Sequence, residues 1–205
     1  SLFWGRPLKS ILAVFDKKVV DFKIGHLQSS NKTFVDKDLE ENAKKFVDFK
    51  SYEKFFKQKN IIINHDQRKD YIRKEIAKVE NNKKFKVNLN EKILDEVTNL
   101  VEKPKILVCE FDKRFLEIPD EILITTMQRY QKCFPTIDNK FNLTNIFIVV
   151  ADINDSKGLV KTGNQRVVDA RLSDAEFFWK RDKSQNLVKQ ISKLKNINYF
   201  KGLGS

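Results

Sequence analysis

The alternation of apolar and polar residues in the first part of the chain predicts strands first and a helix after them. An apolar run at residues 11–15, a charged turn and alternation up to residue 24 predict a β-hairpin with one buried face. Polar residues 25–37 then predict a loop. Residues 39–59 predict a charged helix that is interrupted near Ser51.

Two asparagines mark the starts of two further helices. Asn64 precedes apolar residues at helical spacing that continue to about Val79, and Asn90 precedes a second such stripe. Pro104 closes the second helix, because proline disfavours helical geometry in the residue before it. The apolar run at residues 106–111 then predicts a fully buried strand.

The remaining pattern predicts a helix, a hairpin and a long helix. Pro119 suits the first turn of a helix that aligns Leu123, Met127 and Tyr130. Residues 136–151 predict a second hairpin, and residues 156–182 return to helical spacing.

This order of elements predicts one mixed α+β domain over residues 1–205. We expect a body with a mixed sheet or β-sandwich-like arrangement, from which residues 39–103 form a helical excursion. Residues 183–205 are expected to begin a connection to a next domain. The chain has no initiator Met and no apolar signal core, which indicates an internal segment of a longer chain.

Charge suggests an anionic partner. The chain has 40 basic and 28 acidic residues and a net charge of +12, so RNA is the leading candidate and a membrane surface the second. Abundant Lys, Asn, Ile and Phe are also expected from an AT-rich genome, which explains part of the charge without any ligand. No apolar run approaches the roughly 18 residues that cross a bilayer.

Chemistry-bearing residues are sparse. Cys109 and Cys133 lack CxxC spacing, and His26 and His65 lack metal-binding spacing, so we expect neither a metal site nor a thiol catalyst. Two cysteines in a chain of this size fit a reduced, cytoplasmic compartment. No phosphate-binding glycine loop and no nucleophile–base set can be assigned. We therefore expect no catalytic residues, no cofactor and no independent active site in this chain.

Residues 163–179 hold the most informative pattern. At about 100° per residue, one arc contains Val160, Val167, Val168, Leu172, Ala175, Phe178 and Trp179. Asn164 and Arg171 fall inside this arc and Asp174 lies at its edge, which predicts a buried polar group. The opposite, solvated face is expected to hold Gln165, Asp169, Ser173, Glu176 and Lys180.

A buried charge is costly without a partner, so Arg171 needs a carboxylate or an anion beside it. Asp174, one turn further on, is the obvious partner in a structural pair. The alternative is that Arg171 contacts a phosphate or a partner chain.

A second basic spot lies near the end of the helix that follows Pro119. Arg129 and Lys132 flank Tyr130, and Phe134 follows. Such residues can stack bases and hold phosphates, or they can complement the dipole of a helix end. The candidate RNA-binding residues are therefore Arg129, Lys132, Arg166 and Arg171.

Several long motifs resemble the β chain of the bacterial two-chain glycyl-tRNA synthetases. They lie at residues 6–8, 11–15, 19–22, 96–104, 111–119, 122–127, 163–178 and 193–195. The chain departs from the family at residues 34–38, where Arg-Gly-His-Arg-Phe is usual, and at Tyr130, where His is usual. These departures remove two candidate general bases.

The resemblance implies an enzyme of two α and two β chains that attaches glycine to tRNA at the expense of ATP. The α subunit carries the ATP- and glycine-using site, and the β subunit binds tRNA. In fold, this region resembles the editing-domain region of the phenylalanyl-tRNA synthetase β chain. We expect a non-catalytic, tRNA-handling or architectural domain; the alternatives are a purely structural spacer and an editing-type hydrolase acting on mischarged tRNA.

Overall fold

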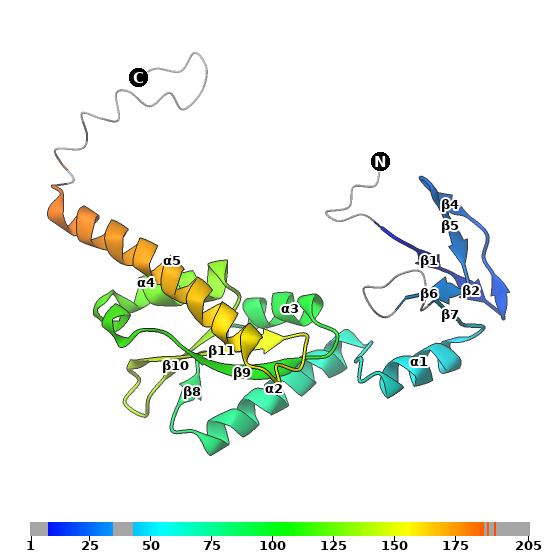
Figure 1. Ribbon diagram of the computed structural model, residues 1–205, viewed down its shortest axis with the longest axis horizontal. Coiled ribbons are helices and arrows are strands. Elements are labelled where there is room, and N and C mark those ends of the chain that lie inside the picture. Colours follow the sequence, from blue (N-terminus) through cyan, green and yellow to red (C-terminus); the bar gives the residue numbers. More distant parts are fainter. Residues whose placement is uncertain (1–7, 35–42, 187, 189–190, 192–205) are drawn as a thin grey trace, which may run out of the picture. The chain divides into compact units, whose positions relative to one another are not determined.

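The computed structural model describes residues 8–34, 43–186, 188 and 191. Contacts divide the chain into two compact units, Ser1–Ile63 (unit 1) and Asn64–Ser205 (unit 2) (Figure 1). Each unit has its own core. A single domain over residues 1–205 stays a prediction.

Short strands and one helix make up the described part of unit 1. The elements are β1 (Ile11–Leu12), β2 (Val14–Phe15), β3 (Lys18–Val19), β4 (Lys23–Ile24), β5 (Leu27–Ser30), β6 (Lys32–Thr33), β7 (Lys44–Lys45) and α1 (Phe49–Gln58). β5 lies between β1, which is parallel to it, and β4, which is antiparallel. The other strands form two antiparallel pairs, β2 with β3 and β6 with β7.

The predicted hairpin is confirmed, but its buried face is not. Asp16 and Lys17 turn the chain with φ of 45° and 63°, the left-handed values that tight two-residue hairpin turns require. Phe15 is nevertheless 77% exposed, and Val19 and Phe22 are also exposed. The short strands leave too little neighbouring structure to cover these side chains.

Two other predictions for unit 1 are wrong. β5 and β6 lie inside the predicted loop at residues 25–37, because paired backbone groups stabilise strands in a polar sequence. β7 lies inside the predicted helix at residues 39–59, of which residues 39–42 fall outside the described residues. The helix begins only at Phe49, where the Asp48 carboxylate accepts the backbone N–H of Ser51 at 2.7 Å.

Aromatic rings form the core of unit 1. The buried cluster contains Phe46, Phe56 and Ile61, with Tyr52 and Phe55 packed against it. Four of these side chains come from α1 or from the residue just after β7, so the core fixes α1 against the β6–β7 pair.

Unit 2 is built around a four-stranded antiparallel sheet with the order β8-β10-β11-β9. Its elements are α2 (His65–Asn82), β8 (Lys86–Val87), α3 (Glu91–Leu100), β9 (Lys105–Glu110), the 3-10 turn η1 (Lys113–Glu117), α4 (Asp120–Thr125), the π-helical turn η2 (Thr126–Tyr130), β10 (Phe134–Ile137), β11 (Leu143–Ala151) and α5 (Leu159–Ser184). The predicted caps are confirmed: Asn64 accepts from the Gln67 N–H at 3.0 Å, and Asn90 accepts from the Lys92 N–H at 3.0 Å.

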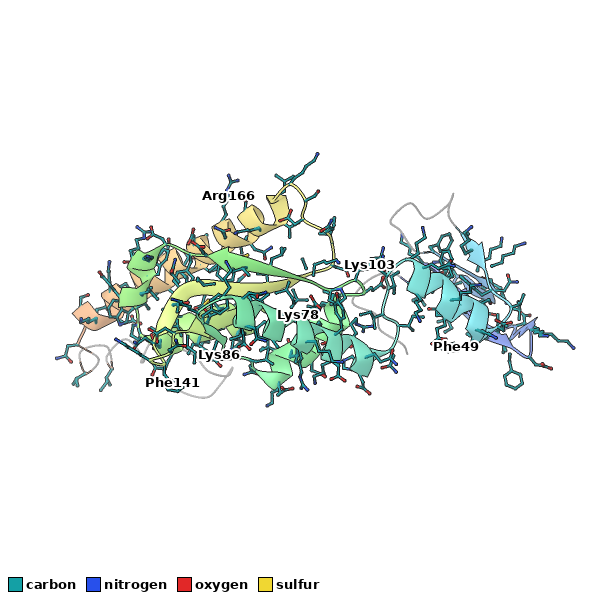
Figure 2. All side chains as sticks on the ribbon, turned by 90° about the horizontal axis from the view of Figure 1, so that it is seen from below. Phe49, Lys78, Lys86, Lys103, Phe141 and Arg166 are labelled. Atoms are coloured by element: carbon teal, nitrogen blue, oxygen red, sulfur yellow. The ribbon has the colours of Figure 1, made fainter. Side chains whose placement is uncertain are left out.

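Helices cover both faces of this sheet. On one face, α2 and α3 pack Ile72, Ile76 and Leu94 against Phe134 and Ile148. The other face carries a cluster from η1, α4, η2 and α5, with Phe115, Leu123, Met127 and Leu172 around Phe147. Figure 2 shows α5 and α2 on opposite sides of the sheet. Alternate residues of β9 and β11 therefore face different cores.

The α+β class is confirmed, but two details of the predicted body are wrong. In unit 2, one sheet between helices replaces the β-sandwich-like arrangement, since both sheet faces meet helices. Within residues 39–103, α2 and α3 are no excursion, because their apolar stripes pack on the sheet. The strand β9 is an edge strand in which Cys109 alone is buried, so it is only partly covered.

The long helix predicted over residues 156–182 is α5, Leu159–Ser184, so both its ends lie within three residues of the prediction. α5 continues to Ser184, and most of the predicted connection at residues 183–205 lies outside the described residues. Among the helices of the described segments, none combines the length and apolar character that a membrane crossing requires.

Candidate nucleic-acid interface

The loop before α5 fixes where this helix begins. Gly158 has φ of 68°, which favours glycine. The Asp155 carboxylate accepts the backbone N–H groups of Val160 at 3.0 Å and Lys161 at 2.7 Å. The N–H of Lys161 is the main reason that the pKa of Asp155 lies below its usual value. The helix N-terminus is thus satisfied by the chain itself.

The face that α5 turns toward the sheet differs from the predicted face. Val168 and Leu172 are buried, as expected. Gln165, Asp169, Ser173 and Glu176, predicted to be solvated, are half-buried instead. The Asp169 carboxylate accepts the backbone N–H of Asp112 at 3.1 Å, which ties α5 to the start of η1. A backbone hydrogen bond thus makes a polar side chain suitable for this interface.

The opposite face of α5 carries apolar and basic residues to the surface. Phe177 is 61% exposed, Phe178 is 53% exposed, and Val167 is also exposed. The two rings meet edge to face with centroids 5.5 Å apart, and the Arg181 guanidinium lies 5.9 Å from the Phe178 ring centroid. Sequence reasoning missed Arg181, although its helical spacing from Phe177 and Phe178 could have indicated it.

Arg171 lies on this outer face, so the prediction that it is a buried charge is wrong. Its Nη1 lies 3.9 Å from Asp174 Oδ2, and the two side chains are 60% and 67% exposed. Asn164 joins neither of them, because its amide donates to the Val160 carbonyl at 2.8 Å within the helix. The structural role predicted for these three residues stays a prediction.

Arg166 also points to solvent. Figure 2 shows its side chain projecting from α5 away from the sheet. Within the described part of the chain, Arg166 forms no ion pair. Arg166, Arg171 and Arg181 (the α5 arginines) are all exposed on the half of α5 that faces away from the sheet, spread over about 140° around the helix axis.

The two basic residues of the second predicted spot, Arg129 and Lys132, have different surroundings in the structure. Lys132 has φ of 54° and forms an ion pair with Glu96 of α3, so its charge fastens two elements of unit 2. Arg129 is exposed, and its guanidinium lies 5.8 Å from the ring centroid of Tyr130, which is 64% exposed. The π-helical turn η2 adds a residue to the helical turn, which moves Tyr130 away from the core stripe of Leu123 and Met127.

Three basic residues of α2 are engaged with α3. Lys69 Nζ lies 2.9 Å from Asp95 Oδ1, and Arg73 Nη2 lies 2.5 Å from Glu91 Oε2. Arg68 Nε donates to the Thr98 carbonyl at 2.9 Å. These contacts hold the two helices together across their exposed edge.

Nucleophile and metal chemistry find little support in the described segments. Burial raises the pKa of the Cys109 thiol to about 11 and that of the Cys133 thiol to about 12, so both stay protonated near neutral pH. Among the residues with described positions, no group of three His, Cys, Asp or Glu side chains is arranged to hold a metal ion.

Comparison with known proteins assigns the family. The model of the family described as "Glycyl-tRNA synthetase beta subunit" matches residues 1–205. The chain belongs to this family. The resemblance deduced from the motifs is thereby confirmed.

Relatives from several bacteria are named as glycine–tRNA ligase beta subunits. The glycine–tRNA ligase beta subunit of Buchnera aphidicola is 36% identical over 100% of this chain and 31% of its own length. That of Dictyoglomus thermophilum is 35% identical over 99% of this chain and 30% of its own length. The Listeria monocytogenes protein is 32% identical over 100% of this chain and 31% of its own length. The chain spans about a third of the length of these relatives.

Proposed function

We propose that this chain is a tRNA-handling and architectural part of the β subunit of a glycine–tRNA ligase, acting in the cytoplasm. Its relatives are named as beta subunits of that ligase. A beta subunit implies an α subunit, and we assign the ATP- and glycine-dependent step to that partner. The residues of this chain then orient tRNA without taking part in bond formation.

The α5 arginines carry this proposal. Among the residues with described positions, Arg171 is the one of the three that approaches a carboxylate, at 3.9 Å between exposed side chains, a contact that water screens strongly. A guanidinium presents a planar set of donors that matches a phosphate. Three such groups on the outer half of one helix suit contacts to successive phosphates of an RNA backbone.

Arg129 and Tyr130 support a second contact of a different kind. Both side chains are exposed on η2, and an aromatic ring beside a guanidinium can stack on an unpaired base. We assign this pair to RNA contact and Lys132 to the structure, since its charge is engaged by Glu96.

Filter-binding titration of this chain with glycine tRNA at several salt concentrations tests the proposal. Each phosphate contact adds about 0.7 to 0.9 to the slope of log affinity against log salt. The triple variant Arg166→Gln/Arg171→Gln/Arg181→Gln should therefore lower the slope by about 2 to 3. The matched control is Lys74→Gln/Lys83→Gln/Lys84→Gln, which removes equal charge from exposed unit 2 residues outside described ion pairs.

The control should change the slope of log affinity against log salt by less than the value for one phosphate contact, about 0.7 to 0.9. Binding that ignores salt, or no binding by the unaltered chain, would contradict a tRNA-handling role. If the slope falls equally in the two triple variants, the interaction depends only on the net charge of the chain. The assignment of the contact to α5 would then be wrong.

The architectural part of the proposal rests on the apolar side of the same face. Exposed aromatic residues beside arginine are enriched at the centres of protein interfaces. We expect Phe177→Ser/Phe178→Ser to weaken assembly of the complete α–β complex in sedimentation experiments while α5 stays helical by circular dichroism. Unchanged assembly would remove the architectural role from α5.

A further inference from the structure

Within residues 8–34 and 43–63, the lysines of unit 1 form no ion pairs. All ion pairs within the described segments lie in unit 2, from His65 onward. Yet residues 8–34 and 43–63 contain eleven lysines, no arginine and four acidic residues. Four more acidic residues and one lysine occur at 35–42, so the unit as a whole is still basic. In unit 2, by contrast, many basic residues have carboxylate partners.

Two of these lysines face each other across a strand pair. Lys32 of β6 is directly opposite Lys45 of β7 in the antiparallel register. Opposed like charges destabilise a strand pair. The neighbouring residue Phe46 offsets this repulsion. Its side chain is buried in the unit 1 core, and its backbone N–H donates to the Asn31 carbonyl at 2.8 Å. The core therefore holds the two charges together (the ladder pair).

Three more lysines form a stripe on α1. Lys50, Lys54 and Lys57 are exposed and lie at positions i, i+4 and i+7, which share one side of a helix. The stripe is about 10 Å long at about 1.5 Å per residue. Glu53 lies beside this stripe but forms no ion pair within the described part of unit 1. Like charges at this spacing also destabilise a helix.

A further lysine approaches the stripe from another element. Lys17, in the β2–β3 turn, and Lys50 both lower the pKa of Asp48, although the Ser51 hydrogen bonds lower it more. Lys17 and Lys50 therefore lie close to the same carboxylate at the start of α1.

We propose that unit 1 binds the phosphate backbone of RNA through the ladder pair and the α1 stripe. The inference rests on the proposed function, because tRNA is the ligand, and it adds a second binding surface on the other unit. An RNA backbone supplies a row of anions that relieves the repulsion among these lysines. Lysine is a point charge without the planar fork of arginine, so the contacts read phosphate rather than base identity.

The packing of α1 favours RNA over a lipid surface. A helix that lies on a membrane inserts its apolar side between lipids. In α1 that side carries Tyr52, Phe55 and Phe56, which pack in the unit 1 core. Apart from Phe49 at the start of the helix, which is 68% exposed, the apolar side is thus already covered, while the lysine side remains in solvent.

Salt-dependent tRNA binding by the intact chain provides the test. The variant Lys50→Gln/Lys54→Gln/Lys57→Gln should lower the log–log slope by about 2 to 3, from about 0.7 to 0.9 per contact. The affinity lost between about 50 and about 200 mM salt should then shrink by about 20- to 40-fold. Lys32→Thr/Lys45→Thr should lower the slope by about 1 to 2.

Lys74→Gln/Lys83→Gln/Lys84→Gln again serves as the charge-matched control, and circular dichroism verifies that α1 stays folded. If the stripe variant behaves as the control does while the variant of the α5 arginines loses affinity, unit 1 is not the second surface and the proposed function stands. If the unaltered chain does not bind tRNA, both proposals fail. Binding to vesicles of phosphatidylserine and phosphatidylcholine that depends on the stripe, with no effect of the stripe on tRNA, would overturn the choice of ligand.

Discussion

Neighbouring residues on α5 provide a direct test of how this helix is oriented. Leu172 is fully buried in the cluster around Phe147, so Leu172→Ala removes buried methyl groups and leaves a cavity between helix and sheet. Such changes cost about 2 to 5 kcal/mol. We expect about 3 to 4 kcal/mol, because helices and strands on several sides prevent the site from collapsing.

Arg171→Met should cost far less. The Arg171–Asp174 pair is 3.9 Å apart and both side chains are mostly exposed. Surface pairs of this kind contribute about 0 to 1 kcal/mol, and this separation places the pair near the lower end. We expect a change of about 0.5 kcal/mol or less in the free energy of unfolding.

Urea unfolding followed by tryptophan fluorescence measures both values, since Trp179 packs against the same cluster as Leu172. An unchanged dependence on urea concentration would show that the variants alter stability rather than the unfolded state. A cost above about 1.5 kcal/mol for Arg171→Met would refute the orientation, because Leu172 is buried in both orientations and Arg171 in only one of them. It would restore the arc of residues that the sequence pattern indicated.

Three further predictions follow from single sites. Cys109 and Cys133, with pKa raised by burial to about 11 and about 12, should resist iodoacetamide at pH about 8 until the protein unfolds; mass spectrometry detects the adducts, and rapid native labelling would contradict the packing. The folded-state pKa of Asp155 is depressed, so its stabilising effect is present above the ordinary value of 3.8 and is lost as pH falls through the folded-state pKa. The difference in Tm between the unaltered chain and Asp155→Ala should therefore shrink in acid. A difference that stays constant with pH would show that the charge of the Asp155 carboxylate does not stabilise the fold. Lys54→Gln should stabilise α1 by about 0.2 to 0.5 kcal/mol for each like-charge pair removed; a lower Tm would show that Lys54 has a partner.

Local signals predicted the start and end of several elements. Asn64 and Asn90 cap helices through their side-chain oxygens, and this chemistry depends only on neighbouring backbone N–H groups. Pro104 and Pro119 act through their own restricted backbone. Such features need no knowledge of tertiary contacts, which is why sequence alone located them.

Features that depend on the neighbours of an element were not predicted. The π-helical turn at η2 is one, since Gln128 is held there by a hydrogen bond to the Asn88 carbonyl, 40 residues away. The ladder of β6 and β7 is another, because its partner strands are polar. The orientation of α5 is the clearest case: an arc chosen to collect the apolar residues placed Val167 and Phe178 inside, whereas the structure exposes both.

That error has a physical cause. Choosing the most apolar arc assumes that a helix has a single apolar partner, namely its own core. α5 instead meets the sheet with Val168 and Leu172, aided by the hydrogen bond from Asp112 to Asp169. Its other apolar residues therefore remain available for a second partner, and a pattern with two apolar sides cannot be assigned one orientation.

The two kinds of contact proposed for this chain, with phosphate and with a protein partner, should consequently respond differently to salt. Contacts between lysine and phosphate weaken as salt rises, because the released counterions lose their entropic advantage. Burial of Phe177 and Phe178 against a protein partner has no such dependence and is favoured by excluded salts. A complex of this chain with both partners should therefore release RNA first as salt is raised, while a protein bound over the outer face of α5 stays in place. Simultaneous release would mean that charged contacts also hold the protein partner, with the rings of Phe177 and Phe178 contributing little.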